Sequence, residues 1–257
     1  MNTRIAGSKS FFTAILLFRG GSNLQKDFDR SVLEWIYERL IRTFGKRHWW
    51  PAETPFEIVI GAILTQGTAW SNVEKAIRAL REKKYLDAQS LYHLDEKILA
   101  KTIRSSGFFN VKAKRLKNFL AYFFERCSGD LKKMFQIPTP TLRRELLAIA
   151  GLGEETTDSI LLYAGEKMTF VVDGYTRRIF SRHGLLDGKE EYDNIQNYFM
   201  NSLPHRSALF NEYHALLVEV GKRHCRNTPL CRGCPLDPLP RTKKGCEAFM
   251  KKQERKI

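Results

Sequence analysis

The sequence has few cysteines and no long apolar run. Its 257 residues include 5 cysteines, too few for a disulfide-dense scaffold. The apolar stretch 11–18 is interrupted by Thr13 and falls far short of the roughly 20 residues that span a bilayer. We therefore expect neither a disulfide scaffold nor a membrane-spanning protein.

Acidic residues are also scarce. The chain has 28 Asp and Glu against 43 Lys and Arg, a net charge of +15. Such a balance favours a polyanionic partner. Hydrophobic residues make up 43% of the chain, enough to bury the core of one large domain or two modest lobes.

The first acidic residue is Asp27, and four basic residues precede it. We predict that residues 1–26 form a flexible extension, and an organellar presequence is the alternative. A secretory signal is not expected, because no A-x-A cleavage site follows the short apolar stretch.

From Asp27 onward, apolar residues recur at spacings of three and four, which predicts amphipathic helices. Gly, Pro and Ser breaks at 105–107, 138–140 and 151–153 separate them. No sustained alternation of apolar and polar residues predicts strands. We expect an all-α protein of about ten helices.

The segment 146–161 predicts a helix, a Gly151-Leu152-Gly153 hairpin and a second helix. Glycine permits positive φ and close approach of the backbone, so that N–H groups at the second helix start can reach a phosphate. An ordinary helix connection with a glycine cap is the alternative.

A second motif lies where an apolar run ends at Asp173 and a basic helix begins. Asp173 is predicted to be an N-cap. The positive end of the helix dipole keeps such a carboxylate ionised, which is useful where positive charge develops in a reaction. The two roles are compatible.

Four cysteines, with spacings of x5, x2 and x11, form a third motif: Cys225, Cys231, Cys234 and Cys246. Four thiolates can hold a [4Fe-4S] cluster or a tetrahedral zinc. Because only one pair is closely spaced, we favour iron-sulfur and keep zinc as the alternative.

A fourth motif is aromatic. Trp49 and Trp50 lie before one predicted helix, and Gln66 and Trp70 follow it. They are either core aromatics with a surface glutamine, or a stacking pocket for an extruded base, with Gln66 filling the gap left in a duplex.

In this order, the four motifs resemble the helix-hairpin-helix DNA glycosylases of the endonuclease III superfamily, over most of the chain from Trp49 to Cys246. The segment 107–116 is similar to a Gly-aromatic-aromatic-Asn-x-Lys-Ala element of that family. The resemblance implies two helical lobes with the substrate cleft between them. It divides the chain into a helical barrel lobe with the hairpin at 50–165 and a second lobe, with the cluster loop, at 27–49 plus 166–257.

Two details indicate the subtype. Bifunctional members of the family carry a lysine where this chain has Glu155, and a carboxylate cannot form a Schiff base. The Trp-Trp-Pro element, Trp70 and Val-Val-Asp-x-Tyr look closest to the 3-methyladenine DNA glycosylase branch. AP lyase activity is therefore not expected, although another lysine could replace the missing one.

The resemblance implies a monofunctional glycosylase that removes an alkylated purine from damaged double-stranded DNA. The expected roles are catalysis by Asp173, a base pocket of Trp49, Trp50 and Trp70, DNA contacts from Gln66, Gly151, Gly153, Lys112 and Lys114, and a [4Fe-4S] cluster on the four cysteines. The alternatives are an endonuclease III-like glycosylase and lyase for oxidised pyrimidines, or a non-catalytic DNA-binding protein. For the lysines, a solvated basic helix face is the alternative.

We expect an intracellular monomer that acts with DNA in a prokaryotic cytoplasm or nucleoid, with organellar targeting left open.

Overall fold

The computed structural model describes residues 24–255, and all its regular elements are helical. The prediction of an all-α protein is confirmed. Residues 1–23, which hold most of the predicted flexible extension 1–26, lie outside the described part of the chain. The first helix already begins at Leu24.

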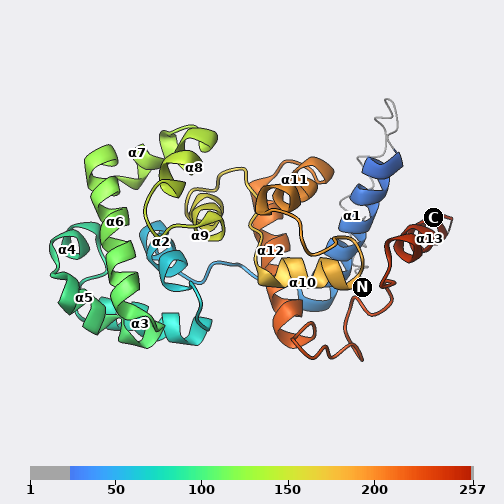
Figure 1. The fold of residues 1–257 in the computed structure, drawn as a ribbon, viewed down its shortest axis with the longest axis horizontal. Coiled ribbons are helices and arrows are strands. Elements are labelled where there is room, and N and C mark those ends of the chain that lie inside the picture. Colours follow the sequence, from blue (N-terminus) through green and yellow to red (C-terminus); the bar gives the residue numbers. More distant parts are fainter. Residues whose placement is uncertain (1–23, 256–257) are drawn as a thin grey trace, which may run out of the picture.

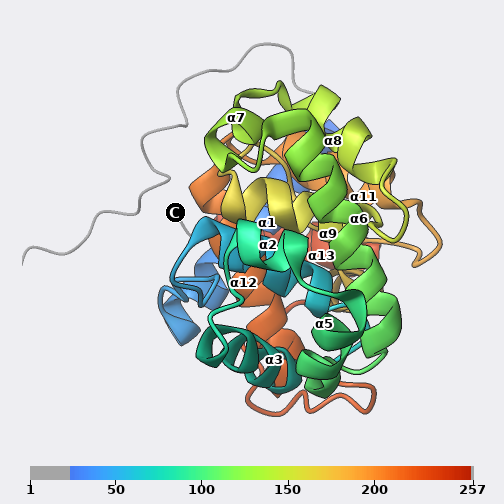
Figure 2. The ribbon, with the colours of Figure 1, turned by 90° about the vertical axis from the view of Figure 1, so that its left-hand side faces the viewer.

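The helices gather in two groups along the long axis of the molecule (Figure 1). The first group contains α2 (Pro55–Leu64), α3 (Trp70–Glu82), α4 (Ala88–His93), α5 (Glu96–Thr102), the 3-10 turn η2 (Arg104–Ser106), α6 (Phe109–Cys127), α7 (Leu131–Gln136), α8 (Thr139–Leu147) and α9 (Glu154–Ser159). The second group contains α1 (Leu24–Phe44), α10 (Gly174–Arg182), α11 (Tyr192–Ser202), α12 (Ser207–Arg223) and α13 (Lys243–Glu254). Figure 2 looks along that axis, with the first group in front of the second.

Each group surrounds its own apolar core. One cluster of buried side chains runs from Val59 to Ala164, and the other combines Val32–Leu40 with residues between Leu162 and Met250. The chain starts in the second group, crosses at 45–54 and returns at 165–173 (Figure 1). On this basis we propose the division into lobes 50–165 and 27–49 plus 166–257.

A single π-helical turn, η3 (Ile160–Ala164), continues α9 and serves both cores. Ile160 and Leu161 belong to the first cluster, whereas Leu162 and Tyr163 belong to the second. π-turns are rare and are often found at functional sites. The helix that follows the predicted hairpin is therefore built into the junction between the lobes.

Polar caps fix several helix starts. The side chain of Thr54 accepts a hydrogen bond from Glu57 N, and Pro55 occupies the first turn of α2. Thr242 caps α13 in the same way. These caps fix the starts of α2 and α13, whereas α6, α8 and α9, which follow the breaks seen in the sequence, begin without a side-chain cap. Between residues 24 and 255, no helix is long and apolar enough to cross a bilayer.

Candidate active site

Asp173 is the N-cap of α10, as predicted. Its Oδ1 accepts hydrogen bonds from the backbone N–H of Thr176 at 2.7 Å and from the Thr176 hydroxyl at 2.9 Å. The residue is 7% exposed. Because the cap uses Oδ1, the second oxygen, Oδ2, is the one left for chemistry.

Oδ2 of Asp173 lies 3.4 Å from Nε2 of His214 on α12. This separation is long for a hydrogen bond, so the contact is mainly electrostatic. Burial raises the pKa of Asp173, but the interaction with His214 and the hydrogen bonds from Thr176 outweigh burial and hold the pKa below its usual value. The site therefore contains a buried carboxylate that is ionised at neutral pH.

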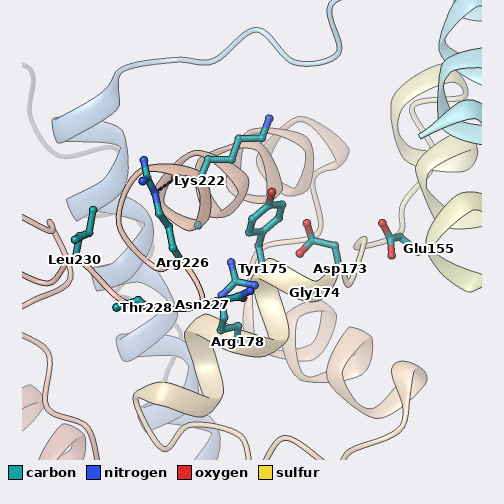
Figure 3. Close-up of a pocket in the computed structure, with 11 residues that line it drawn as sticks. Glu155, Asp173, Gly174, Tyr175, Arg178, Lys222, Arg226, Asn227, Thr228 and Leu230 are labelled. Carbon is teal, nitrogen blue, oxygen red and sulfur yellow. Dashed lines mark hydrogen bonds between the residues drawn. The ribbon is translucent and has the colours of Figure 1, made fainter. Parts of the chain in front are cut away.

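Asp173 opens onto a cleft with a volume of about 770 Å³, lined by residues between 173 and 230 and, from α9, by Glu155. The cleft is lined by Glu155, Asp173, Gly174, Tyr175, Arg178, Gly221, Lys222, Arg226, Asn227, Thr228 and Leu230. Figure 3 shows the two carboxylates at one end and the basic side chains at the other. This polarity suits a ligand with negative phosphates and one reacting centre near Asp173.

Glu155 on α9 faces the same cleft from the first lobe (Figure 3). Desolvation, followed by the negative charge of Asp173, raises its pKa. The two carboxylates therefore differ in character, because Asp173 is held ionised while Glu155 is more readily protonated. No amine occupies this position, since the residue is a glutamate.

The three predicted pocket indoles lie together. Ring centroids of Trp49 and Trp50 are 5.4 Å apart, those of Trp49 and Trp70 5.6 Å, and those of Trp50 and Trp70 5.1 Å. Trp50 also packs against Tyr163 at 5.3 Å, and Nζ of Lys222 lies 5.6 Å from the Trp49 ring. The aromatic cluster thus borders the cleft through Lys222, while Tyr163 links it to the interior.

Gln66 is hydrogen-bonded to the hairpin and to α9. Its Nε2 donates to the carbonyl of Gly151 at 3.0 Å and to the hydroxyl of Thr156 at 2.8 Å, and Arg115 donates to its Oε1. Insertion of Gln66 into a duplex would require release of these bonds. Residues 85 positions apart therefore form one continuous surface.

The two hairpin glycines differ in what they require. Gly151 has φ +98°, and a Cβ there would lie 2.3 Å from Cγ of Arg115, so glycine is needed for both conformation and space. Gly153 is the N-cap of α9, with φ −91° and nothing within 4 Å of a Cβ. Its space is open for a ligand to approach the backbone.

The structure corrects the role predicted for Lys112. Its side chain is fully buried, and its Nζ donates to the carbonyls of Leu64 at 2.8 Å and Ser106 at 2.6 Å. Desolvation, followed by the charge of Arg115, lowers its pKa to about 8. Lys112 ties loops together and cannot reach a phosphate, whereas Lys114 is exposed as expected.

Two apolar side chains at the start of α6 were not identified from the sequence. Phe108 is 73% exposed with φ +44°, and Val111 is 49% exposed. They lie on the same helix as Arg115, which contacts the hairpin through Gln66. The signal was present in the segment 107–116, where two adjacent phenylalanines cannot both face one core.

Three of the four clustered cysteines, Cys225, Cys231 and Cys234, line one small cavity beside Arg182 and His183. Sγ of Cys225 accepts a hydrogen bond from Arg182 at 3.3 Å. Burial raises the pKa of Cys234, as does the proximity of the other two thiols. Sulfur donors in this number suit iron or zinc.

The fourth cysteine differs. Cys246 is buried, its Sγ donates to the carbonyl of Pro240 at 3.3 Å, and burial raises its pKa to about 11. Within the described residues, no group of three or more His, Cys, Asp or Glu side chains is arranged as a metal site. The cavity and donor types fit a metal centre, but the fourth thiol is turned toward backbone carbonyls.

The two-lobed helical fold, with a glycine hairpin and a buried aspartate facing the cleft, defines a helix-hairpin-helix protein of the DNA repair type. The chain belongs to the HhH-GPD superfamily of base excision DNA repair proteins, whose family model matches residues 60–205. The prediction from the motifs is confirmed at this level.

Individual relatives agree with this assignment. MJ1434 of Methanocaldococcus jannaschii, provisionally named a DNA repair glycosylase, is 47% identical over 78% of this chain and 92% of its own length. Endonuclease III of Sulfolobus acidocaldarius is 29% identical over 70% of this chain and 78% of its own.

Among solved structures, the 3-methyladenine DNA glycosylase MagIII of H. pylori, bound to 1,N6-ethenoadenine, superposes with a TM-score of 0.65. It is 27% identical and covers 76% of this chain and 97% of its own. An endonuclease III–DNA complex has a TM-score of 0.70 at 21% identity, over 86% and 98% of the two chains, and shows the shared fold. The chain is therefore a DNA glycosylase by family.

Proposed function

We propose that this glycosylase removes alkylated purines of the 3-methyladenine type without cleaving the strand. The observation that carries the proposal is the cleft itself. It combines a buried, ionised Asp173 with Glu155 at the position where a Schiff-base mechanism needs an amine. Similarity to MagIII, a 3-methyladenine glycosylase by title, supports the alkylpurine class.

In this proposal, the damaged nucleotide leaves the duplex and its base reaches the indoles of Trp49, Trp50 and Trp70. Unstacking costs a few kcal/mol. A cationic alkylated purine recovers about 1 to 2 kcal/mol from an electron-rich indole face. Since alkylation already makes the base a good leaving group, little acid catalysis is needed.

Asp173 supplies the electrostatic part of the mechanism. Oδ2 stabilises the positive charge that develops on the deoxyribose, and it orients or deprotonates the attacking water. The C1′–N bond breaks, its electron pair leaves with the base, and water adds to C1′. The products are a free base and an abasic site.

Lys114, Gly153 and the basic wall of the cleft are proposed to hold phosphates, with Gln66 and Gly151 on the same DNA-facing surface. Phe108 adds an exposed apolar side chain to this surface, beside Val111. Lys112 is left out because it is buried. The protein is proposed to act as an intracellular monomer on damaged duplex DNA.

The experiment that tests this function is chromatography of bases released by the purified protein from dimethyl sulfate-treated duplex DNA. Release of 3-methyladenine above the no-enzyme rate is expected. Release of no methylated base would contradict the alkylpurine assignment.

A second function rests on one observation. Lys222 lines the same cleft as Asp173, so an amine is present although not at Glu155. It could attack C1′ and make the protein a glycosylase and lyase for oxidised pyrimidines. Borohydride trapping separates the two, because a covalent protein–DNA adduct that disappears in Lys222→Met would favour the lyase. Salt-sensitive DNA binding with no base release from any damaged substrate would favour the binding-only alternative.

We also propose that Cys225, Cys231, Cys234 and Cys246 hold a [4Fe-4S] cluster, with zinc as the alternative. The convergence of three thiols supports this, as does the contact of Cys246 with the carbonyl of His183, which lines the same cavity. Such a cluster would tie the loop 225–246 together and takes no part in bond cleavage. Iron, sulfide and zinc analysis of anaerobically purified protein tests it, and absence of both metals would contradict it.

A further inference from the structure

A buried chain of polar groups, outside the lining of the cleft, reaches Asp173. Nε2 of His214 lies 3.4 Å from Oδ2 of Asp173, and Nδ1 of the same ring makes a short hydrogen bond to the hydroxyl of Tyr163. The three residues are 7%, 6% and 5% exposed for Asp173, His214 and Tyr163. They come from α10, α12 and the π-turn η3, respectively.

We propose that Tyr163 and His214 are positioning residues that orient Oδ2 of Asp173 and keep it ionised. The inference rests on the proposed catalytic role of Asp173. Tyr163, in the π-turn between the two cores, selects the tautomer of His214. His214 in turn orients the reacting carboxylate.

The contacts favour one direction for the hydrogen bonds. Nε2 of His214 faces Oδ2 of Asp173, a carboxylate oxygen that can only accept, so the ring hydrogen is favoured on Nε2. Nδ1 is then the acceptor of the bond to Tyr163, and the phenol hydroxyl is its donor. Burial, followed by the charges of Asp173, Glu155 and Glu212, raises the pKa of Tyr163 well above its usual value, so the phenol keeps the proton that this bond needs.

The geometry supports a positional role. Nε2 of His214 makes no hydrogen bond of good geometry among the described residues, and the acceptor that it faces is Oδ2 of Asp173, 3.4 Å away. Oδ1 is already held by Thr176. With one oxygen capped and the other facing an N–H donor, the carboxylate is restrained from two sides.

Tyr163 also connects this chain of groups to the base pocket, since its ring packs 5.3 Å from that of Trp50. The other charged groups near Asp173 are Glu155 from α9 and Arg178 and Lys222 across the cleft. The negative charge of Glu155 can only raise the pKa of Asp173. Arg178 and Lys222 line the open cleft, where solvent screens them, whereas His214 is buried. The buried contact is therefore expected to dominate the ionisation of Asp173.

The first test does not require a known lesion. NMR of the full-length protein labelled with ¹⁵N-histidine, with His214 assigned by comparison with His214→Gln, reports which ring nitrogen carries hydrogen. The Nε2–H tautomer is expected in the wild type, and Tyr163→Phe should produce a mixture. An Nδ1–H tautomer in the wild type, or no change in Tyr163→Phe, would overturn the proposal.

The second test measures single-turnover base release from dimethyl sulfate-treated duplex between pH 5 and pH 8. The wild-type rate should change little, because the pKa of Asp173 lies below this range. In Tyr163→Phe and His214→Leu, the pKa of Asp173 should rise into this range, so the rate should fall as the pH falls. Below the new pKa, the ionised fraction and the rate fall about tenfold for each pH unit.

Matched variants separate a positioning role of Tyr163 and His214 from an effect of their loss on packing. Tyr198→Phe removes another buried phenol hydroxyl, one without a hydrogen-bond partner in the described structure, and should leave the pH profile unchanged. His214→Gln keeps an N–H donor and should retain more activity than His214→Leu. Affinity for a duplex with a tetrahydrofuran abasic analogue should stay within about twofold in all of them, because the proposed effect is on turnover.

The outcomes distinguish this proposal from the proposed function. If Asp173→Asn leaves base release unchanged, the catalytic role of Asp173 fails. The tautomer measurement alone then tests the arrangement of Tyr163, His214 and Asp173. If Asp173→Asn abolishes release while Tyr163→Phe and His214→Leu keep the wild-type pH profile, the positioning role fails and the proposed function stands.

Discussion

Replacement of Arg143 by alanine should destabilise the protein strongly, because it strands a buried charge. Arg143 on α8 donates to both carboxylate oxygens of Asp158 on α9, at 3.0 and 3.1 Å, and to Asp193 on α11 at 2.8 Å. The Asp158 side chain is fully buried. Gln196 and Thr169 donate to the same carboxylate but carry no charge. The ion pair of Arg143 with Asp158 thus joins both helices of the hairpin, and the bond from Arg143 to Asp193 extends the link to the second lobe.

The magnitude follows from this environment. Breaking a buried ion pair by removing one partner costs about 3 to 5 kcal/mol. Because Arg143 is 21% exposed and two neutral donors remain, we expect the lower end, about 3 kcal/mol. At about 2 to 4 °C per kcal/mol for a chain of this size, the melting temperature should fall by about 6 to 12 °C.

Equilibrium urea unfolding followed by circular dichroism measures the loss, with Arg126→Ala as the control. Arg126 is 53% exposed in its ion pair with Glu145, where solvent screens the charges, so its removal should cost far less than that of Arg143. Equal losses in the two variants would refute the reasoning, because the difference in burial is its only basis.

Three further predictions concern the hairpin and the lysines. Gly151→Ala should lower stability by about 1 to 3 kcal/mol and weaken DNA binding, whereas Gly153→Ala should leave thermal unfolding nearly unchanged and affect only DNA affinity. Lys112 has a folded pKa of about 8 against 10.5 when unfolded, so the unfolded state binds more protons between these values. The free energy of unfolding should therefore rise with pH in that window. Urea unfolding at pH 7.5 and 10 should show this rise in the wild type and in Lys114→Met but not in Lys112→Met. Lys222→Met should increase release of cationic methylpurines relative to neutral ethenoadenine, since its ammonium group lies over the indole on which a cation would stack. An unchanged ratio would mean that this lysine does not compete with the base.

The motifs of the sequence predicted the helical class and the start of α10 because those features depend on local spacing. Asp173 after an apolar run reads as an N-cap, and the structure has it as one. The Gly-x-Gly break likewise predicted the hairpin. Such signals lie within a few residues of each other, so no knowledge of tertiary contacts is needed.

The errors and omissions arose from contacts between distant residues. Lys112 belongs to a basic stretch that resembles a solvated helix face, yet it donates to a carbonyl 48 positions away. Tyr163 and His214 lie within apolar helices and look like core residues, although 51 positions separate two groups that share a hydrogen bond. Periodicity identifies the buried face of a helix but does not say which polar groups meet there.

The most direct test of the account compares wild type with Asp173→Asn in single-turnover excision from dimethyl sulfate-treated duplex DNA. Asparagine retains an oxygen that can cap α10, so the fold and DNA affinity should persist while the negative charge is lost. We predict at least about a hundredfold slower release of 3-methyladenine. Release at the wild-type rate would show that the ionised carboxylate in the cleft does not drive base excision.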